Sequence, residues 1–156
     1  MPKRPRFKLI IDDKAFSYVV ERSKATKTEI GFYMIGIMRE NAGYVYDVIE
    51  FPYLDRSPVI VSSDPNKLGK ILTALPLGLR VIGTLHKHPE SLGTEYSSID
   101  ESTYINWSSA GFFIHAIFSN NGKKIAAYAV IDKKIRKACL LYTSDAADDG
   151  ESVDLG

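Results

Sequence analysis

The chain has 156 residues, a formal net charge of +1 and 45% hydrophobic residues, a composition typical of one globular domain with a single core. It contains no apolar run near the roughly 20 residues that a membrane-spanning helix needs. The basic start, residues 1–6, lacks the apolar stretch of a signal peptide, so we interpret it as a solvated tail, with a basic docking arm as the alternative. A single cysteine cannot form an internal disulfide, which favours the cytoplasm.

The first half of the chain predicts four strands and two helices. In chain order these are a strand at 7–12, a helix at 12–25, strands at 29–38, 43–54 and 58–63, and a helix at 64–75. Each helix shows apolar residues at helical spacing behind a capping aspartate, and Pro65 follows the second cap. The third segment is continuously apolar and dotted with glycine, which is typical of a buried central strand.

The second half predicts three strands and one helix. These are a strand at 79–89, a helix at 97–110, and strands at 112–119 and 123–132. The last two strands should form a hairpin across an Asn-Asn-Gly turn. Within the helix, Ile99, Tyr104 and Trp107 are the candidate inward residues. Strands that interleave with helices and connect mostly as hairpins predict an α/β domain with a mixed sheet.

The last eighteen residues differ from the rest of the chain. From Cys139 onward there are five acidic residues and no lysine or arginine, so residues 1–138 alone carry a formal charge of about +6. Residues 139–149, CLLYTSDAADD, resemble the translated read-through of a sequencing-library adapter. We therefore treat residues 139–156 as an artefactual tail that replaces the natural end of the chain, with a short acidic disordered tail as the alternative.

Two of the three histidines, His86 and His88, lie two residues apart where the strand at 79–89 ends. Because side chains of a strand alternate, both should project to one side, with Lys87 on the other. Two imidazoles at one rim are a common beginning of a zinc site, which needs a third protein ligand and leaves a position open for water. An isolated His-x-His pair is nevertheless more often structural.

The nearest candidate for a third ligand lies on the next helix. Ser97 and Asp100 are three residues apart and share a face of its first turn. A carboxylate there can reach a metal held by the histidines. The same spacing is also that of a helix cap, and Ser98 with Glu101 offers an overlapping capping box. The spacing alone leaves capping and metal binding open.

Taken together, these segments resemble a known signature. HKHP at 86–89 and SSID at 97–100, separated by seven residues, resemble the motif of the JAMM (JAB1/MPN/Mov34) zinc metalloprotease family, in its minimal archaeal or bacterial form. The family adds an upstream glutamate at the start of a glycine-containing apolar strand, where this chain has Glu29. The resemblance covers most of residues 7–132. It implies a single MPN domain at 7–138, an α/β fold whose mixed, mostly antiparallel sheet is flanked by helices, as in cytidine deaminases.

The resemblance also implies roles for five residues. His86, His88 and Asp100 would ligate Zn²⁺, which lowers the pKa of a bound water to about 7. Glu29 would act as general base and then general acid. Ser97 would donate a hydrogen bond to the oxyanion, a contribution of roughly 3 kcal/mol in comparable sites. One departure is Lys87, since the family often has serine between its histidines.

The activity implied by the resemblance is that of a zinc-dependent isopeptidase. It would hydrolyse the bond after the C-terminus of a ubiquitin-like or a sulfur-carrier protein, as a deubiquitinase does. The alternative of another class is a catalytically inactive MPN scaffold that mediates protein–protein interactions. A moderate charge and the lack of a basic-aromatic cluster argue against a nucleic-acid partner. His115, one polar residue in an apolar strand, is predicted to be a core histidine.

Overall fold

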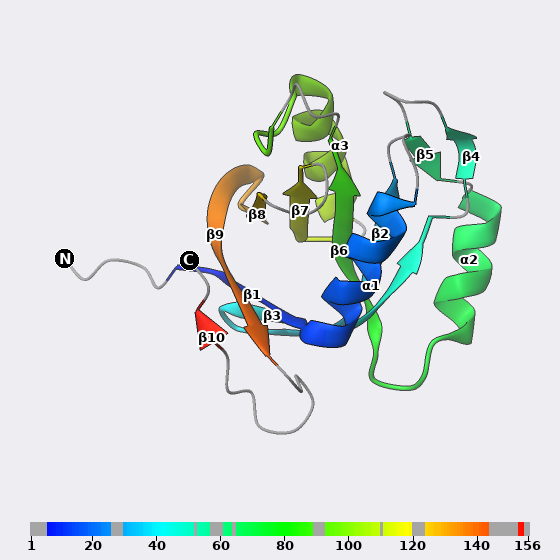
Figure 1. Cartoon of the computed structure of the whole chain (residues 1–156), viewed down its shortest axis with the longest axis horizontal. Helices are drawn as coiled ribbons and strands as arrows, with labels where there is room; N and C mark the ends of the chain where they lie inside the picture. Colours follow the sequence, from blue (N-terminus) through cyan, green and yellow to red (C-terminus); the bar gives the residue numbers. More distant parts are fainter. Residues whose placement is uncertain are drawn as a thin grey trace.

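The computed structural model describes residues 6–25, 30–51, 53–56, 61–63, 65–88, 93–109, 111–119, 124–143 and 153–154. Figure 1 shows the arrangement of its elements. The strands are β1 (Lys8–Asp12), β2 (Gly31–Arg39), β3 (Ala42–Glu50), β4 (Tyr53–Arg56), β5 (Val61–Ser63), β6 (Arg80–Lys87), β7 (Ile114–Phe118), β8 (Ile125–Ile131), β9 (Lys134–Thr143) and β10 (Val153–Asp154). The helices are α1 (Asp13–Lys24), α2 (Pro65–Ala74) and α3 (Ser98–Ser108).

The main sheet closes into a barrel. Its strand order is β1-β3-β2-β6-β7-β8-β9, and β1 pairs with β9 as well as with β3. In Figure 1, β9 (orange) curves away from β8 and runs towards β1 (blue). The predicted α/β fold, a single MPN domain with helices flanking a cytidine-deaminase-like sheet, is therefore wrong. The described residues form a closed mixed barrel of seven strands, with three short helices and with β10 paired to β9.

The pairing that closes the barrel explains why the prediction failed. β1 and β9 lie parallel, with Lys8 opposite Cys139 and Asp12 opposite Thr143. Every β9 residue in this pairing belongs to the segment that we set aside as a tail. Without those residues the sheet has two open edges, and helices must then cover it. Whether residues 139–156 have a foreign origin stays a prediction, but residues 139–143 are part of β9.

The interior of the barrel is apolar. One cluster of buried side chains draws on all seven barrel strands and includes Leu9, Phe32, Val45, Leu85, Phe118, Ala127 and Ala138. Burying a side chain such as leucine or phenylalanine contributes about 1.5–3 kcal/mol. Helix α1 adds Ala15 and Val19 to the same cluster. Of the two candidate caps that the sequence offers, Asp12 and Asp13, the cap is Asp12, whose carboxylate accepts hydrogen bonds from the backbone of Lys14 and Ala15.

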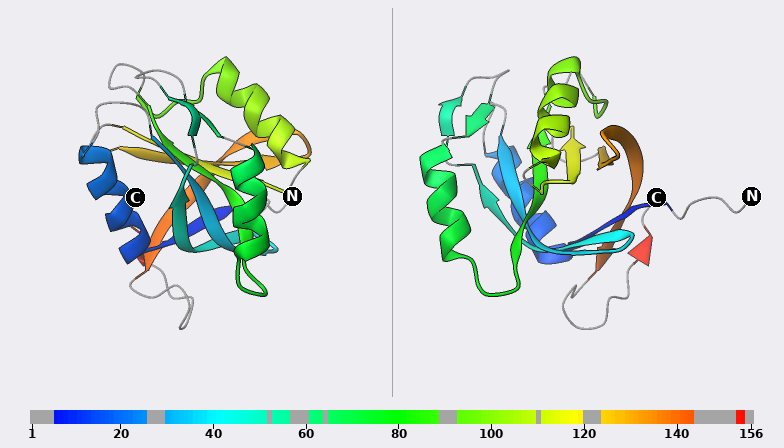
Figure 2. Two further views of the ribbon diagram at one scale, coloured as in Figure 1. Left: turned by 90° about the vertical axis from the view of Figure 1, so that its right-hand side faces the viewer. Right: turned by 180° about the vertical axis from the view of Figure 1, so that it is seen from behind.

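The other two helices lie on the outside of the barrel, as the two views of Figure 2 show. Leu68 of α2, and Leu75 directly after it, pack against outward residues that include Tyr33 and Phe51. Helix α3 packs Tyr104 in a separate cluster with residues of β7 and β8. Of the described helices, none is both long and apolar enough to cross a membrane.

Most predicted elements are confirmed to within a few residues. The predicted strand at 43–54 is divided into β3 and β4. Ile99 is wrong as an inward residue of α3, because 77% of it is exposed. The predicted turn at 120–122 and the predicted cap Asp64 lie outside the described residues.

Candidate metal centre

A β-bulge in β6 decides which way the two histidines face. Ile82 and Leu85 both point into the barrel, although residues three apart on a regular strand lie on opposite faces. The pairing of β6 with β2 shifts register at this point, so β6 carries an extra residue. One extra residue reverses the face of every side chain after it. His86 and His88 consequently lie on the outer face beside α3, and Lys87 on the inner one.

Gly83 makes the approach of β6 to β7 possible. It pairs with Ile114, the first residue of β7. A Cβ atom at Gly83 would lie 1.5 Å from the carbonyl oxygen of Ile114. Only glycine fits between the two backbones, so this residue fixes the strand three positions before His86.

Lys87 points away from the histidines, as the alternation of the strand predicted. Its side chain is buried, and its Nζ donates a hydrogen bond to the carbonyl oxygen of Ser23 in α1, at 3.3 Å. The lysine at the position where the JAMM motif often has serine therefore contacts α1 on the inner side of β6.

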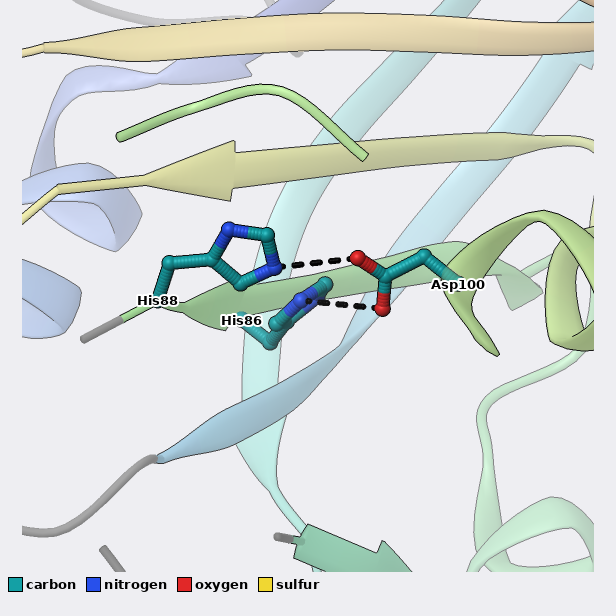
Figure 3. A group of neighbouring side chains, drawn as sticks. All are labelled: His86, His88 and Asp100. Atoms are coloured by element: carbon teal, nitrogen blue, oxygen red, sulfur yellow. Dashed lines mark hydrogen bonds and ion pairs between the residues drawn. The ribbon is translucent and has the colours of Figure 1, made fainter. Parts of the chain in front are cut away.

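The carboxylate of Asp100 joins the two imidazoles. Its Oδ2 lies 3.0 Å from Nε2 of His88, and its Oδ1 lies 3.5 Å from Nε2 of His86. Figure 3 shows both rings turned towards this one side chain, which reaches over from α3. The three residues are the only group of potential metal ligands of this kind within the described part of the chain.

Helix capping and ligand placement occur together at the start of α3. Ser97 is the N-cap, and its Oγ accepts a hydrogen bond from the backbone N–H of Asp100. Oδ2 of Asp100 in turn accepts one from the backbone N–H of Ser97 at 2.9 Å. The capping box is thus formed by Ser97 and Asp100, and the overlapping pair Ser98 and Glu101 does not form it. The two alternatives left open by the sequence are compatible, because the cap holds the carboxylate towards the histidines.

Each histidine also has a partner at its other ring nitrogen. Nδ1 of His88 lies 3.2 Å from the carbonyl oxygen of Gly93, to which it can only donate. Nδ1 of His86 lies 3.4 Å from the hydroxyl of Tyr104, which can donate or accept. Metal-binding histidines commonly have such a partner, which fixes the ring and directs the free nitrogen to the metal.

The hydrogen bonds of His88 require a positive charge between it and Asp100. Both of its ring nitrogens face oxygens that accept hydrogen bonds, the carbonyl of Gly93 and the carboxylate of Asp100. A neutral imidazole has one N–H and one lone pair, so it cannot donate to both. Either a second proton makes His88 an imidazolium, or a metal ion lies between its lone pair and the carboxylate.

The protonation states at neutral pH suit a cation. Burial lowers the pKa of His86 to about 4, despite the attraction of Asp100. Burial pushes the pKa of Asp100 up, but the hydrogen bond from His88, the charge of His86 and the backbone of Ser97 hold it at about 2. Burial raises the pKa of Tyr104 well above its ordinary value, so its hydroxyl stays protonated. Asp100 is therefore an anion and His86 neutral, which are the forms that bind metals.

The donor set fits zinc. One ligand atom from each of His86, His88 and Asp100 lies within 4.8 Å of the others. Bonds of about 2.1 Å in a tetrahedral site place neighbouring ligand atoms roughly 3.4 Å apart. The observed separations from the carboxylate oxygens, 3.0 and 3.5 Å, are close to that value. Two histidines and one carboxylate are also a known ligand set of catalytic zinc sites, which keep one position for water.

The other predicted site residues are only partly placed. Glu29 lies outside the described residues. The residues that follow it lie beside the site, since Gly31 pairs with His86 and Ile30 accepts a hydrogen bond from the backbone of Lys87. Ser97 is exposed next to the carboxylate it helps to hold. The prediction that His115 is a core histidine is confirmed, because it is fully buried.

Sequence reasoning missed the residues that support the ligands. Tyr104 was expected to face inward, but its contact with His86 was not predicted. A signal for it existed, because Tyr104 follows Asp100 by four residues and so shares its face of the helix. The carbonyl of Gly93 carried no such signal, since any residue has a carbonyl group.

Comparison with known proteins identifies the fold and no activity. No protein family profile matches the chain, and neither does any curated protein. Among solved structures, the chain is similar to the solution structure of protein DSY2949 from Desulfitobacterium hafniense, a structural genomics target. The TM-score is 0.71 over 92% of this chain and 98% of that chain, at 15% sequence identity. At that identity the similarity concerns the fold alone, and the name of that protein states no activity.

Proposed function

We propose that this chain is a cytoplasmic, zinc-dependent metallo-isopeptidase. It hydrolyses the peptide or isopeptide bond that follows the C-terminus of a ubiquitin-like or sulfur-carrier protein. The observation that supports the proposal is the convergence of His86, His88 and Asp100, at the spacing that resembles the JAMM protease motif. The proposal rests on this site and not on the fold, because one fold supports many activities.

Different residues of the site can perform different steps of hydrolysis. A bound zinc ion would supply Lewis acidity and lower the pKa of its water to about 7. The hydroxyl of Ser97 accepts a hydrogen bond from Asp100 and still has its proton to donate. Donation to the attacked carbonyl oxygen as it becomes negative would contribute about 3 kcal/mol. Glu29 keeps its predicted role of accepting the water's proton and passing it to the leaving amine.

The barrel restricts how a substrate tail can be recognised. At the site, β6 is paired on both sides, with His86 opposite Gly31 of β2 and Ile117 of β7. An extended tail cannot add to β6 as a further strand, because its backbone groups are already used. Recognition at this strand must therefore come from side chains around the ligands, such as exposed Ile99 beside Asp100.

The test combines metal content with hydrolysis. We expect about one zinc per folded chain, and hydrolysis of ubiquitin-like or sulfur-carrier conjugates to a free C-terminal carboxylate and the amine that was joined to it. The variant Glu29→Gln should keep zinc and lose hydrolysis, because it removes only the proton acceptor. Glu21→Gln, the same substitution at an exposed glutamate of α1, is the matched control and should keep both zinc and hydrolysis. Undiminished hydrolysis by Glu29→Gln would contradict the mechanism.

A second candidate is a domain that binds partners and catalyses nothing. One observation favours it: the capping box and the contacts of Asp100 with both histidines can stabilise α3 on β6 without any reaction. In that case zinc would either be absent or bind without hydrolysis of any conjugate in the panel. Measuring zinc and hydrolysis on the same preparation separates the two functions.

A further inference from the structure

Tyr104 has an unusual environment for a residue that was expected only to fill the core. It is buried, with 2% of its surface exposed, and lies on α3 one turn after Asp100. Its hydroxyl meets Nδ1 of His86 at 3.4 Å. Its ring lies flat against the ring of His115, with centroids 4.0 Å apart and planes 4° from parallel.

His115 is itself held in one orientation. Its Nε2 lies 3.2 Å from the carbonyl oxygen of Phe112, which can only accept, so Nε2 carries the proton. Its Nδ1 lies 2.8 Å from the hydroxyl of Thr84, which therefore donates. Thr84 and His115 face each other across the β6–β7 pairing. The ring on which Tyr104 stacks is thus fixed by two neighbouring strands.

We propose that Tyr104 is a positioning residue for the candidate metal centre. Its hydroxyl holds the ring of His86 so that Nε2 faces Asp100 and His88, and the fixed ring of His115 holds Tyr104. The inference rests on the proposed zinc site, but it does not require that the site hydrolyse a particular conjugate.

A hydroxyl suits this position better than a carbonyl oxygen, because it can reverse the direction of its hydrogen bond. Without metal, the O–H of Tyr104 donates to Nδ1 of His86, and the proton on Nε2 points to the carboxylate of Asp100. When Nε2 binds a metal, the proton is on Nδ1 and is donated to the oxygen of Tyr104. Tyr104 can therefore satisfy His86 in both forms. The carbonyl that faces His88 can serve only one form.

The test is the variant Tyr104→Phe, which keeps the ring and its stacking and removes the hydroxyl. Tyr142→Phe is the matched control, because Tyr142 is a buried tyrosine of β9 that packs against Phe16 of α1. Zinc dissociation constants are measured by competition with a chelating dye. The ring nitrogens of His86 are followed by ¹⁵N NMR in zinc-free and zinc-loaded protein.

We expect Tyr104→Phe to bind zinc about 10–100-fold more weakly than the original chain, the range typical of losing a partner of a metal ligand. Tyr142→Phe should bind zinc as the original chain does. In zinc-free protein, the nitrogen shifts should show the proton of His86 on Nε2 in the original chain and a mixture of the two neutral forms in Tyr104→Phe.

Two results separate this inference from the proposed function. Unchanged zinc affinity together with unchanged His86 shifts in Tyr104→Phe would overturn the role of Tyr104. Zinc binding that weakens as expected, with no hydrolysis of any conjugate, would support Tyr104 and overturn the isopeptidase. A chain that binds no zinc would overturn both, because the inference rests on the proposed zinc site.

Discussion

The three histidines of this chain lie on the same outer face of two neighbouring strands, yet their surroundings differ in kind. His115 on β7 has one partner that donates, Thr84, and one that accepts, the carbonyl of Phe112. A neutral imidazole satisfies both. His88, directly after β6, has two partners that accept, the carbonyl of Gly93 and the carboxylate of Asp100. A neutral imidazole cannot satisfy both.

This difference distinguishes a structural histidine from a candidate metal ligand better than burial does. His115 and His88 are both buried, with 0% and 3% of their surface exposed. What separates them is the balance of donors and acceptors around each ring. Two hydrogen-bond acceptors around one imidazole ring require a cation, and at His88 that cation is either a second proton or a metal ion.

The most direct test of whether His88 and His115 differ in function is to remove each histidine in turn. We expect His88→Ala to lose zinc binding by more than roughly 100-fold, since losing a ligand costs more than losing its hydrogen-bonding partner. His115→Gln keeps all three candidate ligands and removes only the ring on which Tyr104 stacks, so it should weaken zinc binding by no more than the 10–100-fold expected of Tyr104→Phe. Equilibrium dialysis followed by elemental analysis measures both. Equal losses in the two variants would show that the two surroundings are not different in function.

The next largest effect should come from the bulge that turns His86 and His88 outward. Gly83→Ala places a methyl group against the carbonyl oxygen of Ile114, so β6 and β7 must separate at the site. We expect the free energy of unfolding to fall by about 3 kcal/mol, the upper range for overpacking, and zinc affinity to fall with it. Urea unfolding measures the first and dye competition the second.

Gly69→Ala provides the matched control for that substitution. Gly69 lies in α2, and a Cβ atom there would meet nothing within 4 Å. Alanine is a better helix former than glycine, so this variant should be up to about 1 kcal/mol more stable. If both alanine variants behaved alike, the close approach at Gly83 would not be what holds β6 in register.

The sequence predicted the local elements of the site because their signals are local. The cap at Ser97, the spacing of Asp100 behind it and the strand that carries His86 and His88 each depend on a few neighbouring residues. The outward direction of the histidines does not depend on neighbouring residues alone. It depends on the extra residue in β6, which only the pairing with β2 reveals.

The closure of the barrel could not be predicted from the sequence for a related reason. It brings together β1 and β9, whose residues are more than a hundred positions apart and lie parallel. Periodicity predicts that β1 is a strand but carries no information on its partner, and β9 was not predicted because residues 139–143 were assigned to the tail. The contact between Tyr104 and His86 is of the same kind, since the helical face was predictable and the ring it meets was not.

A smaller effect should appear in how the free energy of unfolding depends on pH. Burial lowers the pKa of His115 to about 3 and that of His86 to about 4, both below the ordinary value of 6.5. Below pH 6.5 these histidines bind protons in the unfolded chain but stay neutral in the folded chain. The free energy of unfolding therefore falls as the pH falls. We expect metal-free protein to lose about 1.4 kcal/mol per pH unit for each such histidine between pH 6.5 and 4.

His115→Gln separates the two contributions, because glutamine keeps a polar side chain that does not titrate. Its free energy of unfolding is measured in urea with a chelator at several pH values. The slope of that free energy against pH should be smaller than in the original chain by the contribution of one histidine. A slope identical to that of the original chain would mean that His115 is already accessible to protons in the folded state.

The smallest effect concerns the loop that faces His88. The hydroxyl of Tyr128 in β8 donates to the carbonyl oxygen of Thr94 at 2.9 Å, next to the Gly93 carbonyl that accepts from His88. Tyr128→Phe removes this bond, and we expect a loss of about 1 kcal/mol in the free energy of unfolding. Zinc affinity should fall less than in Tyr104→Phe, because Tyr128 acts on His88 through a length of backbone, whereas Tyr104 touches His86 itself. A larger loss of zinc affinity in Tyr128→Phe would instead make the 93–94 loop the main support of the site.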